Sequence, residues 1–141
     1  MIHNTAGIYY VSLVLNIDNA YKNMYIVFMN RETPVSIVFY LTENGNCPVK
    51  EFLKELPPGD KALVSRDIRT VQQTFPIGLP LVRKIESGLW EIRSKLQSRI
   101  CRVFFTVVSG QIILLHGFIK KSQATPEKEL KTARERKKSF Q

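Results

Sequence analysis

The pattern of apolar and polar positions becomes regular from Val35 onward. The apolar run Val35–Leu41 ends at a turn-forming stretch and predicts a strand. Two helical patterns follow, each with apolar side chains at every third or fourth position. The first predicted helix starts at Pro48 and stops before Pro57, whereas the second has Asp60 as its N-cap and stops at Pro76.

Four β-prone runs separated by tight turns come next and predict an antiparallel meander. These runs cover residues 81–85, 89–95, 99–108 and 111–119. A last helix is predicted from Thr125 and Pro126, and its basic C-terminal end matches the helix dipole. The order β-α-α-β-β-β-β-α predicts an α+β domain, with the helices packed on one face of a twisted, mainly antiparallel sheet.

The first 33 residues differ from the rest. Residues 8–15 and 25–29 are apolar and β-prone, but they have neither a basic start nor a small-residue cleavage site, so they make a poor signal peptide. They form either an extra hairpin or non-native sequence upstream of the real start. We expect residues 1–28 to be an extension and residues 29–141 to be the domain proper.

Charge narrows the classes of partner. The 141 residues carry 21 Lys+Arg and 12 Asp+Glu, a net charge of +9, and the first 33 residues are balanced. Such an excess attracts polyanions such as nucleic acid, although it also serves solubility alone. No stretch approaches the run of about 20 apolar residues that a membrane helix needs, so we expect a cytoplasmic protein without membrane contact.

Few residues offer metal or acid–base chemistry. Cys47 and Cys101 are far apart in the sequence, which predicts neither a zinc site nor a disulfide framework and favours a reducing compartment. His3 and His116 are the only imidazoles, which argues against a ribonuclease with two catalytic histidines. We therefore expect no metal and no cofactor, and catalysis that depends on Lys and Arg.

The tight turns of the meander predict which side chains share a face. One turn pairs Arg93 with Arg102, and the next pairs Val103 with His116. A lone histidine on the core face is more often a packing residue than a catalyst, although a one-residue bulge would turn His116 to the other face. Apart from His116, the predicted core face carries Trp90, Ile92, Cys101, Val103, Phe105, Val107, Ile112, Leu114 and Phe118.

The opposite, open face is predicted to be basic. It carries Lys84 opposite Glu91, together with Arg93, Lys95, Arg102, Thr106 and Lys121. Two arginines directly across from each other repel unless a carboxylate or a bound anion lies between them. Glu91 is one candidate for this role, and an RNA phosphate is the other, because paired guanidinium groups fit its shape.

Three segments follow one another along the chain: Leu89-Trp90-Glu91-Ile92-Arg93, residues 99–108, and residues 114–126, which include His-Gly-Phe-Ile-Lys-Lys at positions 116–121. Together, in this order, they resemble the phage-derived HigB branch of the RelE/ParE toxin superfamily. The resemblance runs from about Val35 to Arg136 and implies a RelE-like fold. It also implies the toxin of a type II toxin–antitoxin system, a metal-independent endoribonuclease that cuts mRNA on the ribosome and inhibits translation. The implied partner is a HigA-like helix-turn-helix antitoxin in a hetero-oligomer.

The resemblance places the catalytic surface on Arg93, Arg102, Lys120 and Lys121. Substrate-binding residues are expected at Lys84, Lys95, Arg99 and His116. The arginines would stabilise the charge that develops on the phosphoryl group, and a lysine crowded by other cations would transfer a proton. Two alternatives stay open: a ParE-like toxin that inhibits DNA gyrase without cutting RNA, and a non-catalytic RNA-binding module.

Overall fold

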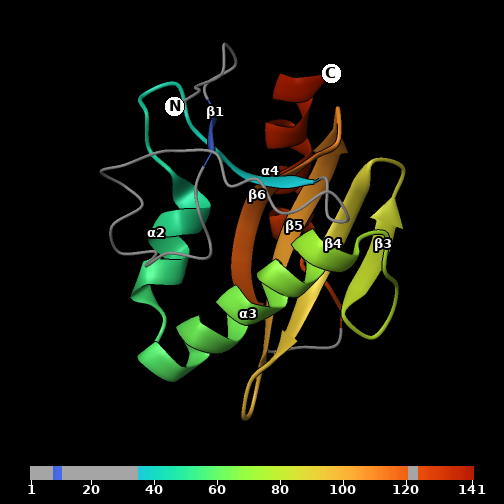
Figure 1. Ribbon diagram of the computed structural model, residues 1–141. Coiled ribbons are helices and arrows are strands. Elements are labelled where there is room, and N and C mark those ends of the chain that lie inside the picture. Colours follow the sequence, from blue (N-terminus) through green and yellow to red (C-terminus); the bar gives the residue numbers. More distant parts are fainter. Residues whose placement is uncertain (1–7, 11–34, 121–123) are drawn as a thin grey trace.

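The computed structural model describes residues 8–10, 35–120 and 124–141, in which six strands form one mixed sheet (Figure 1). The strand order is β1-β2-β6-β5-β4-β3, with β2 and β6 parallel and every other neighbouring pair antiparallel. The elements are β1 (Ile8–Tyr10), β2 (Ser36–Tyr40), α2 (Pro48–Glu55), α3 (Pro58–Thr74), β3 (Val82–Glu86), β4 (Leu89–Lys95), β5 (Ile100–Val108), β6 (Gln111–Lys120), α4 (Glu127–Lys137) and the 3-10 turn η1 (Lys138–Phe140). From β2 onward this confirms the predicted α+β order.

Of the predicted N-terminal extension, the structure describes only β1, which pairs with β2. The other residues before position 35 lie outside the described part, so the division at residue 28 stays a prediction. None of the described helices is both long enough and apolar enough to cross a membrane.

The main core lies between the sheet and the two helices α2 and α3. Their apolar stripes are buried against the predicted core face of the meander. The helical members of this core are Val49, Leu53, Leu56, Val64, Ile68 and Val71. α3 begins at Pro58, which suits the first turn of a helix, so Asp60 lies in that turn and is not the N-cap. Likewise, α4 begins at Glu127, one residue later than predicted.

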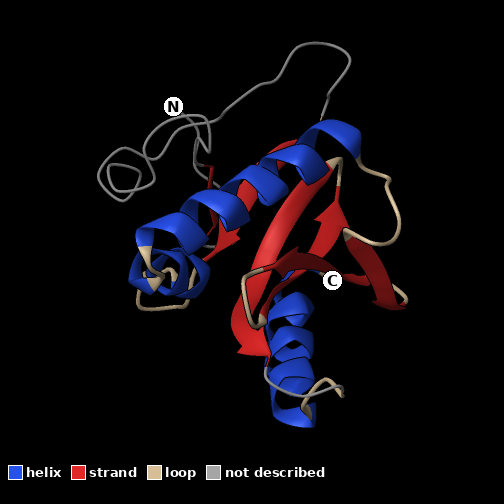
Figure 2. Cartoon of the chain, turned by 90° about the horizontal axis from the view of Figure 1, so that it is seen from below, coloured by secondary structure: helices blue, strands red, loops and turns tan. Residues whose placement is uncertain are grey.

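The last helix, α4, covers the opposite face of the sheet (Figure 2), so the prediction that all helices share one face is wrong. Ala133 of α4 is fully buried in a second apolar cluster. The strand residues of this cluster are Val38, Leu89, Phe104, Ile113, Leu115 and Phe118. Since β5 and β6 are apolar on both faces, the second face also needs a cover.

Two irregularities in strand pairing change which side chains share a face. The predicted pairing of Arg93 with Arg102 is confirmed. In the β5–β6 pair, however, Phe105 faces Leu114 and Phe104 faces His116, so Leu115 is an extra residue on β6. As a result Val103 faces Gly117, and the predicted pairing of Val103 with His116 is wrong. Phe118, predicted on the main core face, instead packs in the α4 cluster.

A second shift lies between β3 and β4. Lys84 was predicted opposite Glu91, but it faces Trp90, and Arg83 takes the position opposite Glu91. The cause is the register shift between Lys84 and Glu86, which leaves Ile85 without a partner across the pair.

Gly117 allows α2 to approach the sheet closely. A Cβ atom at this position would lie 2.6 Å from Cδ2 and 2.8 Å from Cε2 of Phe52, closer than real side-chain atoms come. The absence of a side chain at Gly117 therefore makes room for the Phe52 ring.

Candidate functional site

Four cations converge on the α4 side of the sheet, one from each strand of the meander. This cation cluster consists of Arg83 on β3, Arg93 on β4, Arg102 on β5 and Lys120 on β6. Strand register places them on one face, because Arg83 faces Glu91, Arg93 faces Arg102, and Arg102 faces Phe118, two residues before Lys120.

The carboxylate of Glu91 lies at the centre of the cluster and is fully buried. Its Oε1 atom accepts a hydrogen bond from Nη1 of Arg102 and lies 3.7 Å from Nε of Arg93. The other oxygen, Oε2, has no hydrogen-bond partner among the described residues. One carboxylate among four cations leaves a net charge of +3, so Glu91 separates the two arginines without neutralising the cluster.

Burial changes across the cluster and decides from which side a ligand can reach it. Arg102 and Lys120 are buried, whereas the side chain of Arg93 is 29% exposed and Arg83 is exposed. Burial also lowers the pKa of Lys120, and the nearby charge of Arg102 lowers it further. Its ammonium form is therefore less favoured than that of an ordinary lysine, which is the direction that a proton-transferring group needs.

A pocket of about 320 Å³ opens beside Arg93, between α3 and the ends of β4 and β5. Its lining combines apolar, cationic and acidic side chains. They are Leu63, Arg66, Asp67, Pro80, Leu81, Arg93, Lys95 and Ile100. Arg93 therefore belongs to both the cation cluster and the pocket.

The remaining predicted lysines and arginines have different positions. Lys95 lines the pocket, and Nη2 of Arg99 lies 2.8 Å from Oδ2 of Asp60, which ties Arg99 to the first turn of α3. Lys84 is exposed, and its pairing with Trp90 takes it out of the cation cluster. Lys121 lies outside the described residues. Arg83 was missed from the sequence, because its position depends on the shift at Ile85.

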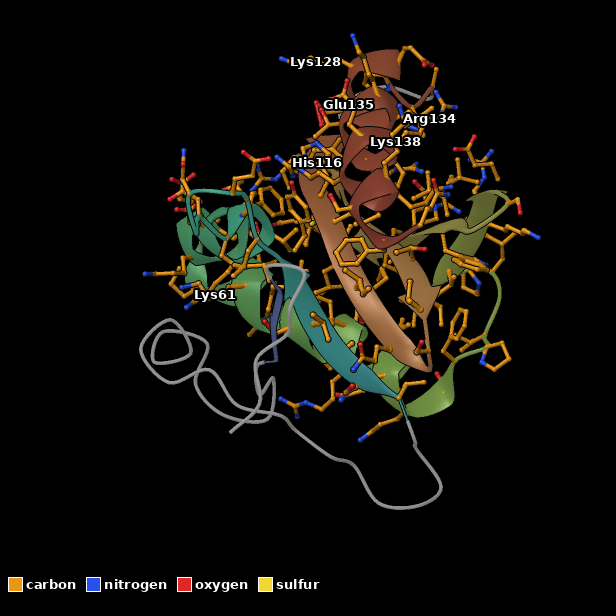
Figure 3. The ribbon with its side chains drawn as sticks, turned by 90° about the horizontal axis from the view of Figure 1, so that it is seen from above. Lys61, His116, Lys128, Arg134, Glu135 and Lys138 are labelled. Atoms are coloured by element: carbon orange, nitrogen blue, oxygen red, sulfur yellow. The ribbon has the colours of Figure 1, made fainter. Side chains whose placement is uncertain are left out.

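His116 contacts α4 through both ring nitrogens. Nε2 lies 2.5 Å from Oε2 of Glu129, and Nδ1 lies 3.3 Å from Nη1 of Arg136. A guanidinium group only donates hydrogen bonds, so Nδ1 accepts and Nε2 carries the hydrogen that points to Glu129. Figure 3 shows His116 beside this helix. The structure thus places the His116 nitrogens against α4 and does not bring them into the cation cluster.

Comparison with protein families gives one match. A family model described as phage derived protein Gp49-like (DUF891) matches residues 51–138. This range includes all four strands of the cation cluster, together with α3 and α4. A comparison with curated proteins gives no match.

Proposed function

We propose that this chain, which belongs to the phage-derived Gp49-like family associated with RelE-like toxins, is a HigB-like toxin that cleaves messenger RNA on the ribosome. The observation that carries this proposal is the cation cluster around the single carboxylate of Glu91. A ribose-phosphate chain carries one negative charge per phosphate, so it would balance the excess positive charge of the cation cluster.

The proposed reaction uses the 2′-hydroxyl of the RNA itself. This hydroxyl loses its proton, its oxygen bonds to the adjacent phosphorus, and the bond to the 5′-oxygen breaks as that oxygen gains a proton. Arg93 and Arg102 stabilise the charge that builds up on the phosphoryl oxygens. Lys120 transfers a proton, because burial and its cationic neighbours lower its pKa. Arg83 and Lys95, both exposed, bind the flanking phosphates.

The proposal includes a partner. A HigA-like helix-turn-helix antitoxin, as the family resemblance implies, binds the toxin in a hetero-oligomer and keeps it inactive. A short neighbouring reading frame that encodes such a protein would support the toxin–antitoxin assignment.

The first test induces the gene in cells and maps the 5′ ends of messenger RNA with and without ribosome engagement. We expect cuts within translated codons, reduced on the order of 100-fold or more in Arg93→Gln. Lys131→Gln is the matched control, since it removes one positive charge at an exposed position of α4 and should leave cleavage unchanged. Intact transcripts with stalled gyrase complexes would instead identify a ParE-like inhibitor, and RNA that is bound but never cut would identify a binding module.

The second test addresses Lys120. Lys120→Arg keeps the positive charge but raises the pKa far above neutrality. We expect the cleavage rate to fall and the limb of the pH–rate profile that reports this residue to disappear. A variant with the wild-type profile and rate would remove Lys120 from the chemistry.

A further inference from the structure

We propose that the pocket between α3 and the ends of β4 and β5 holds one unstacked base of the RNA, and that the carboxylate of Asp67 selects guanine there. This inference rests on the proposed function, because it assigns a base-reading subsite to the same nuclease. It adds a specificity residue, Asp67, that plays no part in the phosphoryl chemistry.

The size and walls of the pocket suit a single base. Its volume of about 320 Å³ is at the lower end of the roughly 300–1,000 Å³ that is typical of small-molecule sites, so it has room for one nucleotide and not for a longer stretch. Leu63, Leu81 and Ile100 provide apolar surfaces for the faces of a planar ring. Sequence-specific proteins commonly read single-stranded RNA in this way, by taking up bases that have left the stack.

The position of the pocket connects base reading to cleavage. Arg93 lines it and also lies 3.7 Å from Glu91 within the cation cluster. Lys95 lines it from the same strand. A base held in the pocket would therefore have its own phosphate beside Arg93, where the proposed reaction takes place. Phosphate contacts would fix the position of the chain, and the base contact would supply the specificity.

Asp67 provides the only carboxylate among the described residues that line the pocket. Its side chain is 14% exposed, and Oδ1 lies 3.4 Å from Nη2 of the neighbouring Arg66, a long contact that leaves acceptor capacity for a ligand. An ionised carboxylate only accepts hydrogen bonds and can take two parallel donors.

Guanine is the base whose hydrogen-bonding edge fits such a carboxylate. Its N1–H and 2-amino groups are adjacent donors, so both oxygens of Asp67 would be used. Adenine and cytosine present an acceptor nitrogen beside the amino group, which a carboxylate repels. Uracil has a single N–H between two carbonyl groups. We therefore expect guanine to bind best and uracil worst.

The test measures binding of 5′-GMP, 5′-IMP and 5′-UMP to the full chain by calorimetry or nuclear magnetic resonance titration. Inosine lacks only the 2-amino group, so GMP should bind on the order of 10-fold more tightly than IMP, as expected for one hydrogen bond to a charged group. Asp67→Asn should abolish this preference. Glu55→Gln, which removes one negative charge at an exposed position of α2, should retain it. Leu63→Trp, which fills the pocket, should weaken binding of all three nucleotides.

Two results separate this inference from the proposed function. If the protein cuts RNA and loses cleavage in Arg93→Gln, but binds the three nucleotides equally, the guanine subsite is rejected and the nuclease stands. If the preference for GMP depends on Asp67 but no RNA is cut, the subsite stands and the nuclease is rejected. A preference for GMP that persists in Asp67→Asn would overturn the role of this carboxylate.

Discussion

Replacing the buried Glu91 with glutamine tests how the cation cluster is held together. Glu91→Gln preserves the shape of the side chain but removes the negative charge that contacts both Arg93 and Arg102. Arg102, only 3% exposed, would then stay buried beside other cations without an opposing charge. We expect the variant to be much less stable than the wild-type protein.

The expected loss follows from the burial of the two partners. Removing one member of a buried ion pair costs about 3–5 kcal/mol, whereas an exposed pair contributes about 0.2–1 kcal/mol. The side chains of Glu91 and Arg102 are 0% and 4% exposed, so the larger range applies. Small domains are stable by only about 5–15 kcal/mol in total, so Glu91→Gln should remove a large part of the free energy of unfolding. Adding Arg102→Met removes the uncompensated charge and should recover part of the loss.

Urea unfolding measures these free energies, with the fluorescence of Trp90 as the signal. Trp90 is the only tryptophan and packs against Phe75 and Phe105 in the main core. Glu86→Gln is the control, because it breaks a half-exposed pair with Arg134 and should cost no more than about 1 kcal/mol. If Glu91→Gln costs as little as this control, or if Arg102→Met gives no recovery, Glu91 does not hold the cluster together.

Three further predictions concern other parts of the fold. Gly117→Ala should lower the free energy of unfolding by about 1–3 kcal/mol, because the added methyl group would clash with Phe52, and a neutral effect in urea unfolding would contradict this contact. Burial lowers the pKa of His116, so its contribution to stability should be complete above the unfolded-state pKa of about 6.5 and should be lost as the pH falls below it. His116→Gln should flatten this part of the stability–pH curve, and equal slopes for both proteins would refute the assignment. The charged groups around the His116 ring, Glu129, Arg136 and Lys128, are the ones that also act on this titration. In the third prediction, added inorganic phosphate should raise the melting temperature of Glu91→Gln more than that of the wild type, and an equal shift would argue against an anion site in the cluster.

Periodicity was enough to predict the elements from β2 to α4 and the main core, with the exception of Phe118, which packs in the α4 cluster. The face covered by α4 was not predicted, although the sequence carried a signal for it. Ile112–Leu115 is a continuous apolar run, and Phe104 and Phe105 are adjacent, so both faces of these central strands are apolar. A strand with one solvated face alternates instead, so such runs indicate cover on both sides.

Within the site, strand pairings that depend only on a tight turn were predicted correctly from the sequence. Pairings that lie beyond a β-bulge were predicted wrongly. Arg93 and Arg102 face each other because the turn between β4 and β5 leaves no extra residue between them. Arg83 was missed and His116 was placed on the wrong face because β3 and β6 each contain an additional residue. Ile85 and Leu115 are ordinary strand formers, so no glycine or proline marks either bulge, and packing on both sides of the sheet decides where they form.

The extra residue in β6 explains why a buried lysine reaches the cation cluster at all. Side chains alternate between the faces of a strand, so an unbulged β6 that pairs His116 with Val103 would point Lys120 toward α2 and α3. With Leu115 inserted, Gly117 turns to that side, where α2 leaves no room for a side chain, and Lys120 turns to the side of Arg102. The extra residue Leu115 therefore has two effects: it lets α2 pack closely against the sheet at Gly117, and it places Lys120 in the cation cluster. It also makes Lys120 the described lysine that lies next to Arg102 on this face.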